Sequence, residues 1–164
     1  MITQERLKEL FDYQDGNLLW KVQKANRIKI GSIAGSMNSD KYGQHYMNVS
    51  IDDEPYKLHR LIYLWHHGTL PKIIDHIDGN RLNNAIENLR GATASQNALN
   101  GKFRVNNNSG YKNVSFEKRK QKWRVCLSVN GVSKSFGYYD DLELAALVAE
   151  EARNKFCKQF ARHF

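Results

Sequence analysis

The sequence predicts an α+β protein in which a β-rich N-terminal region leads into a strand–strand–helix unit, followed by a three-stranded antiparallel sheet packed on one helix. Short β-prone segments separated by glycines dominate residues 17–51. Residues 72–101 then combine two short apolar segments with a capped helix, and residues 110–159 contain three alternating segments before a helical one. The length of 164 residues is enough for one or two small domains.

The N-terminal region is expected to begin with a helix and to continue as short strands. Residues 1–12 carry apolar side chains at helical spacing, with Thr3 as the candidate N-cap. An Asp-Gly turn signal precedes a predicted strand at residues 17–22, and another strand is expected at residues 45–51. Residues 52–55, with the sequence DDEP, form a predicted turn.

Residues 56–67, with the sequence YKLHRLIYLWHH, return to the helical period. Gly68 and Pro71 end this predicted helix. His59 lies one position from its apolar stripe. We interpret His59 as a core-edge histidine that bonds a backbone carbonyl and braces the neighbouring site, in preference to a direct ligand of a metal.

The stretch that carries the chemistry is residues 72–101, KIIDHIDGNRLNNAIENLRGATASQNALNG. Residues 73–77 are predicted to form a strand that ends in an Asp-Gly-Asn turn, and residues 86–89 a second strand. Thr93 and Gln96 have the spacing of a capping box, so a helix is expected to follow and to end at Gly101.

Asp75, His76 and Asn97 are the candidate reactive residues of this stretch. The oxygen atoms of Asp75 and Asn97 suit Mg2+ or a similar hard ion. His76 is a candidate general base, although in a regular strand it points to the side opposite Asp75. The pattern alone leaves open the alternative that these residues only form turns and caps.

Two other kinds of metal site are not favoured. Counted from Asp75, the third position is an isoleucine and the glycine falls at the fifth, which does not fit an EF-hand loop. Zinc would need more histidines or cysteines nearby, and Cys126 and Cys157 are far apart without ligand spacing.

The C-terminal module has its own pattern. Three segments alternate in strand fashion: residues 111–116, 122–129 and 132–138. The pair Asn130-Gly131 between the last two is a strong hairpin signal. An Asp-x-x-Glu pattern from Asp140 then starts a helix that runs to about residue 159 with an alanine-rich face. Residues 102–109, which precede the module, contain three consecutive asparagines and little that could pack, and are predicted to be a linker.

Positive charge is concentrated in the C-terminal part. The net charge is +8, but residues 1–100 hold 12 Lys and Arg against 11 Asp and Glu, whereas residues 101–164 hold 13 against 6. This asymmetry favours a polyanionic partner over a merely soluble basic surface. The candidate contact residues are Lys102, Arg104, Lys118, Arg119, Lys120, Lys122, Trp123 and Arg124. The two in the linker could equally be solvated, and Trp123 could equally belong to the core.

The location expected from the sequence is the cytoplasm. No run of 18 or more apolar residues predicts a membrane span, and residues 1–16 lack the layout of a secretory signal. The two cysteines do not form a disulfide framework, which fits a reducing compartment.

The segment LHR…DHIDGNRLNNAIENLRGATASQN, within residues 56–101, resembles the HNH nuclease family, in the subgroup found in phage and intron-encoded homing endonucleases. His76, Asn88 and Asn97 match the three signature positions, and the last is Asn in place of His. This resemblance implies a ββα-metal nuclease core within a domain of residues 1–101.

The same resemblance implies roles for single residues. His76 would be the general base, and Asp75 and Asn97 would hold one divalent ion, Mg2+ or Mn2+ and not zinc, on the scissile phosphate. Asn88 would be a structural brace that bonds across the hairpin and holds the strand carrying His76.

The C-terminal segment, from SGYKNVSF to LAALVAEE, resembles the APETALA-type (ethylene-response-factor-like) DNA-binding domain. This second resemblance implies a DNA-binding domain at residues 110–164 after the linker at 102–109. Its sheet would lie in the major groove of duplex DNA, with Arg119, Trp123 and Arg124 at bases or the sugar-phosphate backbone. Lys118 and Lys120 would contact phosphates or solvent.

Together these features predict a site-specific DNA endonuclease of homing type that acts as a monomer on double-stranded DNA and nicks one strand. The alternative is a non-catalytic DNA-binding regulator that keeps the nuclease shell, against which the intact trio of Asp75, His76 and Asn97 argues. An RNA-directed role ranks lower because no RNP-like aromatic motif is present. A phage-encoded protein in the cytoplasm of a bacterial host is expected.

Overall fold

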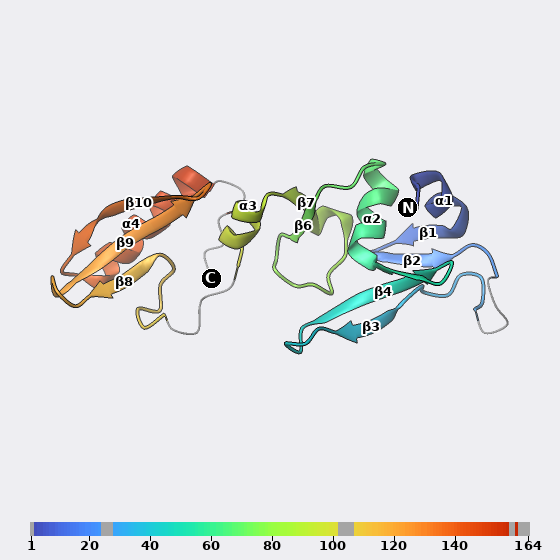
Figure 1. Ribbon diagram of the computed structural model, residues 1–164, viewed down its shortest axis with the longest axis horizontal. Coiled ribbons are helices and arrows are strands. Elements are labelled where there is room, and N and C mark those ends of the chain that lie inside the picture. Colours follow the sequence, from blue (N-terminus) through green and yellow to red (C-terminus); the bar gives the residue numbers. More distant parts are fainter. Residues whose placement is uncertain (1, 24–27, 102–106, 158–159, 161–164) are drawn as a thin grey trace. The chain divides into compact units, whose positions relative to one another are not determined.

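The fold is described from a computed structural model, for residues 2–23, 28–101, 107–157 and 160. By its contacts the chain divides into two compact units, Met1–Gly91 and Ala92–Phe164. The sequence analysis placed the boundary after residue 101. In the structure the division by contacts lies after Gly91, so the helix that follows Thr93 is grouped with the second unit. Each unit is described by itself (Figure 1).

The first unit begins with helix α1 (Gln4–Leu10), whose first turn is capped by the Thr3 hydroxyl as predicted, through a bond from the Arg6 N–H. The chain then forms the hairpin β1 (Phe11–Gln14) and β2 (Asn17–Trp20). The sequence extended the helix over Phe11 and missed strand β1. Phe11 is fully buried and packs its ring 4.5 Å from that of Trp20, so the strand places it in the core.

A three-stranded antiparallel sheet follows, in the order β3 (Ser36–Ser39), β4 (His45–Ile51) and β5 (Glu54–Lys57). Strand β4 has the predicted bounds. The predicted turn at residues 52–55 is shorter in the structure: Asp52 and Asp53, both at positive φ, make the turn, and Pro55 belongs to β5. Because β5 lies at the edge of this sheet, it accommodates a proline.

Helix α2 (Leu58–His67) covers the core of the first unit. Its inward face carries Leu58, Leu61, Ile62 and Leu64, all buried. Gly68 ends the helix at φ +70°, the left-handed conformation that favours glycine at this position, as the sequence predicted.

The chemically rich stretch forms a two-stranded sheet of β6 (Ile73–His76) and β7 (Leu89–Ala92), joined by a long loop. The predicted strand at residues 86–89 is wrong. A 3-10 turn, η1 (Ile86–Asn88), stands there, and the strand begins only at Leu89. Residues three apart share one face of such a turn, so Ile86 and Leu89 can both reach the core, whereas in a strand they would point to opposite sides.

In the second unit, α3 (Ala94–Leu99) has the predicted capping box: Thr93 and Gln96 each accept a bond from the other's backbone N–H. The main sheet has the order β10-β9-β8, built from β8 (Val114–Glu117), β9 (Lys122–Val129) and β10 (Val132–Tyr139). Asn130 and Gly131 form the turn between β9 and β10, both at positive φ.

Helix α4 (Leu142–Cys157) packs on this sheet through its predicted alanine face, where Ala145 and Ala149 meet Val114 and Val125. The predicted cap is wrong by one residue. Asp141, and not Asp140, accepts a 2.7 Å bond from the N–H of Leu144. None of the described helices is long and apolar enough to cross a membrane.

Candidate active site

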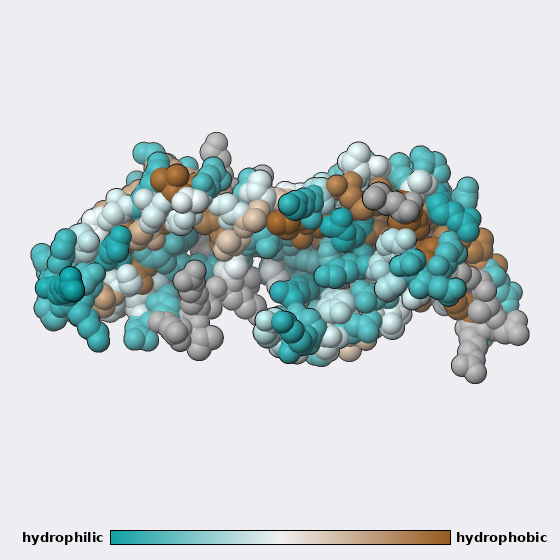
Figure 2. All heavy atoms as spheres, in the orientation of Figure 1, coloured by the Kyte–Doolittle hydropathy of each residue, from teal (hydrophilic) through white to brown (hydrophobic). Residues whose placement is uncertain are grey.

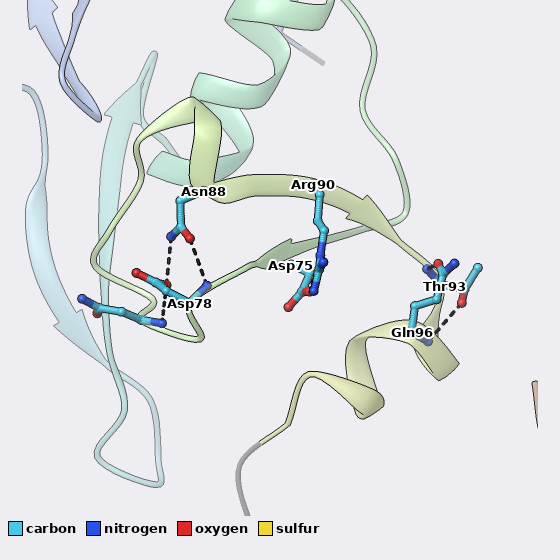
Figure 3. A network of polar contacts seen from close by, with 7 residues as sticks. Asp75, Asp78, Asn88, Arg90, Thr93 and Gln96 are labelled. Carbon is cyan, nitrogen blue, oxygen red and sulfur yellow. Dashed lines mark hydrogen bonds and ion pairs between the residues drawn. The ribbon is translucent and has the colours of Figure 1, made fainter. Parts of the chain in front are cut away.

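The loop between β6 and β7 is held together by side-chain amides and one carboxylate. Asn88 accepts a bond from the backbone N–H of Asp78 (3.0 Å) and donates to the Asp78 carboxylate (2.9 Å) and to the carbonyl of Asn83 (2.8 Å). Asn83 donates a further bond of 2.7 Å to Asp78. Figure 3 shows the Asn88 side chain bonded to Asp78. These bonds join the two ends of the loop, directly after the strand that carries Asp75 and His76.

The bonds to Asp78 also set its charge. Burial alone would raise the pKa of this carboxyl, but the bonds donated by the Asn80 N–H, Asn83 and Asn88 outweigh it and hold the pKa below its usual value. Asp78 is therefore ionised, and it serves as the acceptor at the centre of the loop.

Asp75 is buried beside Arg90 of β7. The residue is 5% exposed, and one carboxylate oxygen accepts bonds from Nε (2.9 Å) and Nη2 (2.7 Å) of Arg90. Figure 3 shows the Arg90 side chain reaching from β7 to Asp75 on β6. Such a charge-assisted pair fixes the position of the Asp75 carboxylate.

His76, the next residue along β6, has different partners. It is 7% exposed, and its Nε2 lies 3.0 Å from Oδ1 of Asn84. The ring of His59 on α2 stands edge-on to it, with centroids 5.2 Å apart and planes at 68°. Burial, followed by electrostatic repulsion from His76, Lys57, Arg60 and Arg81, lowers the pKa of His59 to about 3.

Within the first unit the structure thus brings together four residues that the sequence singled out: His59, Asp75, His76 and Asn88. Asn97 lies on the exposed surface of α3, in the second unit. Among the described residues, no group of three or more His, Cys, Asp or Glu side chains could hold a metal ion.

Two residues of the site were missed. The sequence interpreted Asn84 as a turn residue, but it is buried, with 4% of its surface exposed, and contacts His76. No signal in the sequence separated it from Asn80 and Asn83. Arg90 was missed because the predicted strand stopped at residue 89; with β7 in its observed place, Arg90 faces Asp75 across the pair.

The proposed contact residues of the second unit divide by the pleat of β9. Trp123 packs against the cluster under α4 and stands 4.9 Å from the ring of Phe116, which agrees with the core alternative for it. Arg124 points to the opposite face, where Ser115 and Tyr138 are its neighbours on β8 and β10.

The lysines and Arg119 of this set lie near one end of the sheet. Lys118, Arg119 and Lys120 follow β8, and the Lys120 ammonium lies 3.6 Å from the ring centroid of Tyr138. Lys122 pairs with Asp140 at 3.0 Å on the surface. Figure 2 shows hydrophilic side chains covering this end of the unit. Lys102 and Arg104 lie outside the described residues.

Comparison with known proteins identifies the central stretch. The HNH endonuclease family model matches residues 56–99, from the end of β5 through α2, β6, β7 and α3. Protein 3.8 of Escherichia phage T7 is 39% identical over 107 residues, which cover 63% of this chain and 88% of that protein. An uncharacterized HNH endonuclease of Acanthamoeba polyphaga mimivirus is 36% identical over 115 residues, 66% of this chain and 59% of that protein. No solved structure matches. The chain therefore contains an HNH endonuclease domain, matched over residues 56–99.

Proposed function

We propose that this protein is a metal-dependent, site-specific DNA endonuclease of homing type, with His76 as its general base. The HNH endonuclease match over residues 56–99 supports a nuclease that acts on DNA. The observation that carries the finer proposal is the environment of His76: a buried imidazole next to Asp75, inside the matched segment and held by side-chain partners. Orientation of the base is what general-base catalysis requires of the protein.

In the proposed reaction, His76 takes a proton from a water molecule while the oxygen of that water attacks the phosphorus of a phosphodiester. The bond from phosphorus to the 3′-oxygen breaks, and the 3′-oxygen leaves as the alcohol after it gains a proton from solvent. Asn88 supports this step indirectly, because its bonds to Asp78 and Asn83 hold the loop that follows the strand of His76.

In the first unit, the residue proposed to hold a divalent ion is Asp75. Its carboxylate oxygens fit Mg2+ or Mn2+, which keep several positions for water and phosphate oxygens. When bound, the ion would supply positive charge at the scissile phosphate and the leaving oxygen. Arg90 would keep the Asp75 carboxylate in place for it.

The second unit is proposed to anchor the enzyme on double-stranded DNA, as an APETALA-type module would. Its open sheet face carries Arg124, and the neighbouring turn carries Lys118, Arg119 and Lys120. Side chains of this kind read guanine edges or neutralise phosphates. A monomer with one nuclease site would nick one strand of the duplex.

A specific observation favours a second candidate function, a DNA-binding regulator without catalysis. Arg90 already occupies one carboxylate oxygen of Asp75 with two bonds. If Arg90 cannot be displaced or shared, Asp75 would serve the fold alone, and the chain would bind DNA without cutting it.

One experiment separates the two. Supercoiled plasmid that carries DNA of the likely host is incubated with the full chain, with Mg2+ or with EDTA, beside His76→Ala. We expect open-circular product only with Mg2+, from wild type and not from His76→Ala. His67→Ala is the matched control, since His67 lies exposed at the end of α2, and it should nick like wild type. Binding with no nicking, or equal nicking by His76→Ala, would support the regulator or another base. Direct formation of linear DNA at low enzyme would contradict single-strand nicking.

A further inference from the structure

We propose that Asn84 is a positioning residue that fixes the tautomer of His76, so that Nε2 carries the hydrogen and Nδ1 is the nitrogen that accepts the proton. This inference rests on the proposed function of His76 as a base. It assigns a role to a residue whose sequence position suggested only a turn.

The contact is between two buried polar groups. Asn84 is 4% exposed and His76 is 7% exposed, and Oδ1 lies 3.0 Å from Nε2. A hydrogen bond between groups excluded from water is costly to lose, because neither partner can turn to solvent. The pair therefore holds one arrangement of the ring.

The other end of the Asn84 side chain decides which atom faces the ring. Its Nδ2 donates to the carbonyl oxygen of Leu82 at 3.4 Å. A flipped amide would set two oxygen atoms against each other at that position. Oδ1 is thus the atom that faces His76, and an amide oxygen only accepts. Nε2 must then donate, and in a neutral imidazole the lone pair is left on Nδ1.

The fold clamps the backbone that carries Asn84. A Cβ atom on Gly16 would lie 2.7 Å from the nitrogen of Ala85 and 3.0 Å from the carbonyl carbon of Asn84, so the β1–β2 turn and this loop touch through their backbones. The Tyr13 hydroxyl also accepts bonds from the N–H groups of Gly16 and Ile86, each at 3.1 Å. The β1–β2 hairpin therefore holds the backbone of Asn84 in place. A residue that only completed a turn would not need this support.

His59 limits the ring from another direction. Its edge-on contact with His76 leaves the imidazole little room to rotate. His59 is uncharged near neutral pH, so it adds no second positive charge when His76 takes up a proton. Packing by His59 and hydrogen bonding by Asn84 thus act on the same ring: the first limits its rotation, and the second favours one tautomer.

Nitrogen-15 NMR of histidine-labelled full-length protein tests the tautomer directly. The His76 signals are assigned by their loss in His76→Gln, at a pH where the ring is neutral. We expect the Nε2–H form in wild type and in Asn84→Asp, which keeps an acceptor oxygen, and a mixture of tautomers in Asn84→Ala. Asn83→Ala, a change in the same loop that leaves the His76 contact intact, should keep the Nε2–H form. The Nδ1–H form in wild type, or an unchanged tautomer in Asn84→Ala, overturns the inference.

Plasmid nicking gives the second readout. We expect Asn84→Ala to lower kcat by about tenfold to a hundredfold, because loss of the hydrogen-bond partner that orients a functional histidine has effects of this size. The KM for DNA should stay within about twofold. Asn84→Asp should recover most of the rate. A wild-type kcat in folded Asn84→Ala overturns the inference but leaves the proposed function standing. If wild type itself does not nick DNA, the proposed function fails, and the tautomer is still decided by NMR. Should Asn84→Ala not fold, the tautomers of wild type and Asn84→Asp decide.

Discussion

Four asparagines of the β6–β7 loop have the same side chain but different surroundings. Asn80 and Asn83 are exposed and bond to nearby backbone or to Asp78, as turn residues do. Asn88 joins the two ends of the loop, and Asn84 is buried against His76. The sequence could separate Asn88 only through family resemblance. It could not separate Asn84, because burial depends on the β1–β2 hairpin, which lies some seventy residues earlier in the chain.

The pair of Asp75 and Arg90 should contribute to stability before any ligand binds. We predict that Arg90→Met lowers the free energy of unfolding by about 3 kcal/mol, because it leaves a carboxylate buried without its guanidinium. Chemical denaturation measures the change. Arg81→Met is the matched control: Arg81 pairs with Asp40 on the surface at 3.3 Å, and its loss should cost less than about 1 kcal/mol. Equal losses in the two variants would contradict a structural role for the Arg90 pair.

His59 should make the protein sensitive to acid. Its pKa is about 3 in the folded chain, against the ordinary 6.5, so between these values the unfolded chain binds a proton that the folded chain does not. The contribution of uncharged His59 to the free energy of unfolding is therefore fully present above pH 6.5 and is lost as the pH falls toward about 3. The midpoint temperature of thermal unfolding should decrease less steeply across this pH range for His59→Phe, whose ring keeps the packing without titrating. Parallel curves for wild type and variant would show that His59 does not cause the dependence.

At the scale of elements, the sequence predicted most helices and strands because their signals are local. Strands β4 and β9, the Asn130-Gly131 turn, the capping box of α3 and the Gly68 end of α2 all have the predicted places. The errors occur where two structures satisfy one pattern. A short apolar segment such as residues 86–89 fits a strand or a 3-10 turn that leads into one, as at η1, and two consecutive aspartates offered two caps for α4.

The cap of α4 gives a direct test of the second of these cases. Asp141→Ala should lower the free energy of unfolding of the second unit by about 1 kcal/mol, because the Leu144 N–H loses its acceptor. Asp140→Ala is the natural control, since Asp140 forms only an exposed pair with Lys122 and its loss should change stability by a few tenths of a kcal/mol. Denaturation followed by the fluorescence of Trp123 reports on this unit, although two further tryptophans contribute background. A larger effect of Asp140→Ala would restore the cap that the sequence predicted.

At the scale of the whole molecule, the two units carry different chemistry. The segment that matches the HNH family crosses the division between them, since it starts in β5 and ends in α3. Most of the net charge lies beyond it, with 13 Lys and Arg against 6 Asp and Glu in residues 101–164. The uneven distribution of charge along the chain can be read from the sequence alone. Which basic side chains share a face depended on the register of the β8–β9–β10 sheet, which turns Arg124 away from α4 and Trp123 toward it.

The register makes a prediction about DNA that net charge does not. We expect Arg124→Ala to weaken binding to a random-sequence duplex in EDTA and to make the plot of log K against log salt shallower by about one, because one phosphate contact is lost from the open face. Lys134→Ala removes the same charge from the other face, where the Lys134 ammonium lies 4.5 Å from the ring centroid of Phe156 on α4, and it should leave the slope unchanged. Fluorescence anisotropy with the full chain at several salt concentrations measures both. If the two variants lose affinity and slope equally, the DNA responds to the total charge of the unit, and the open sheet face is not its binding surface.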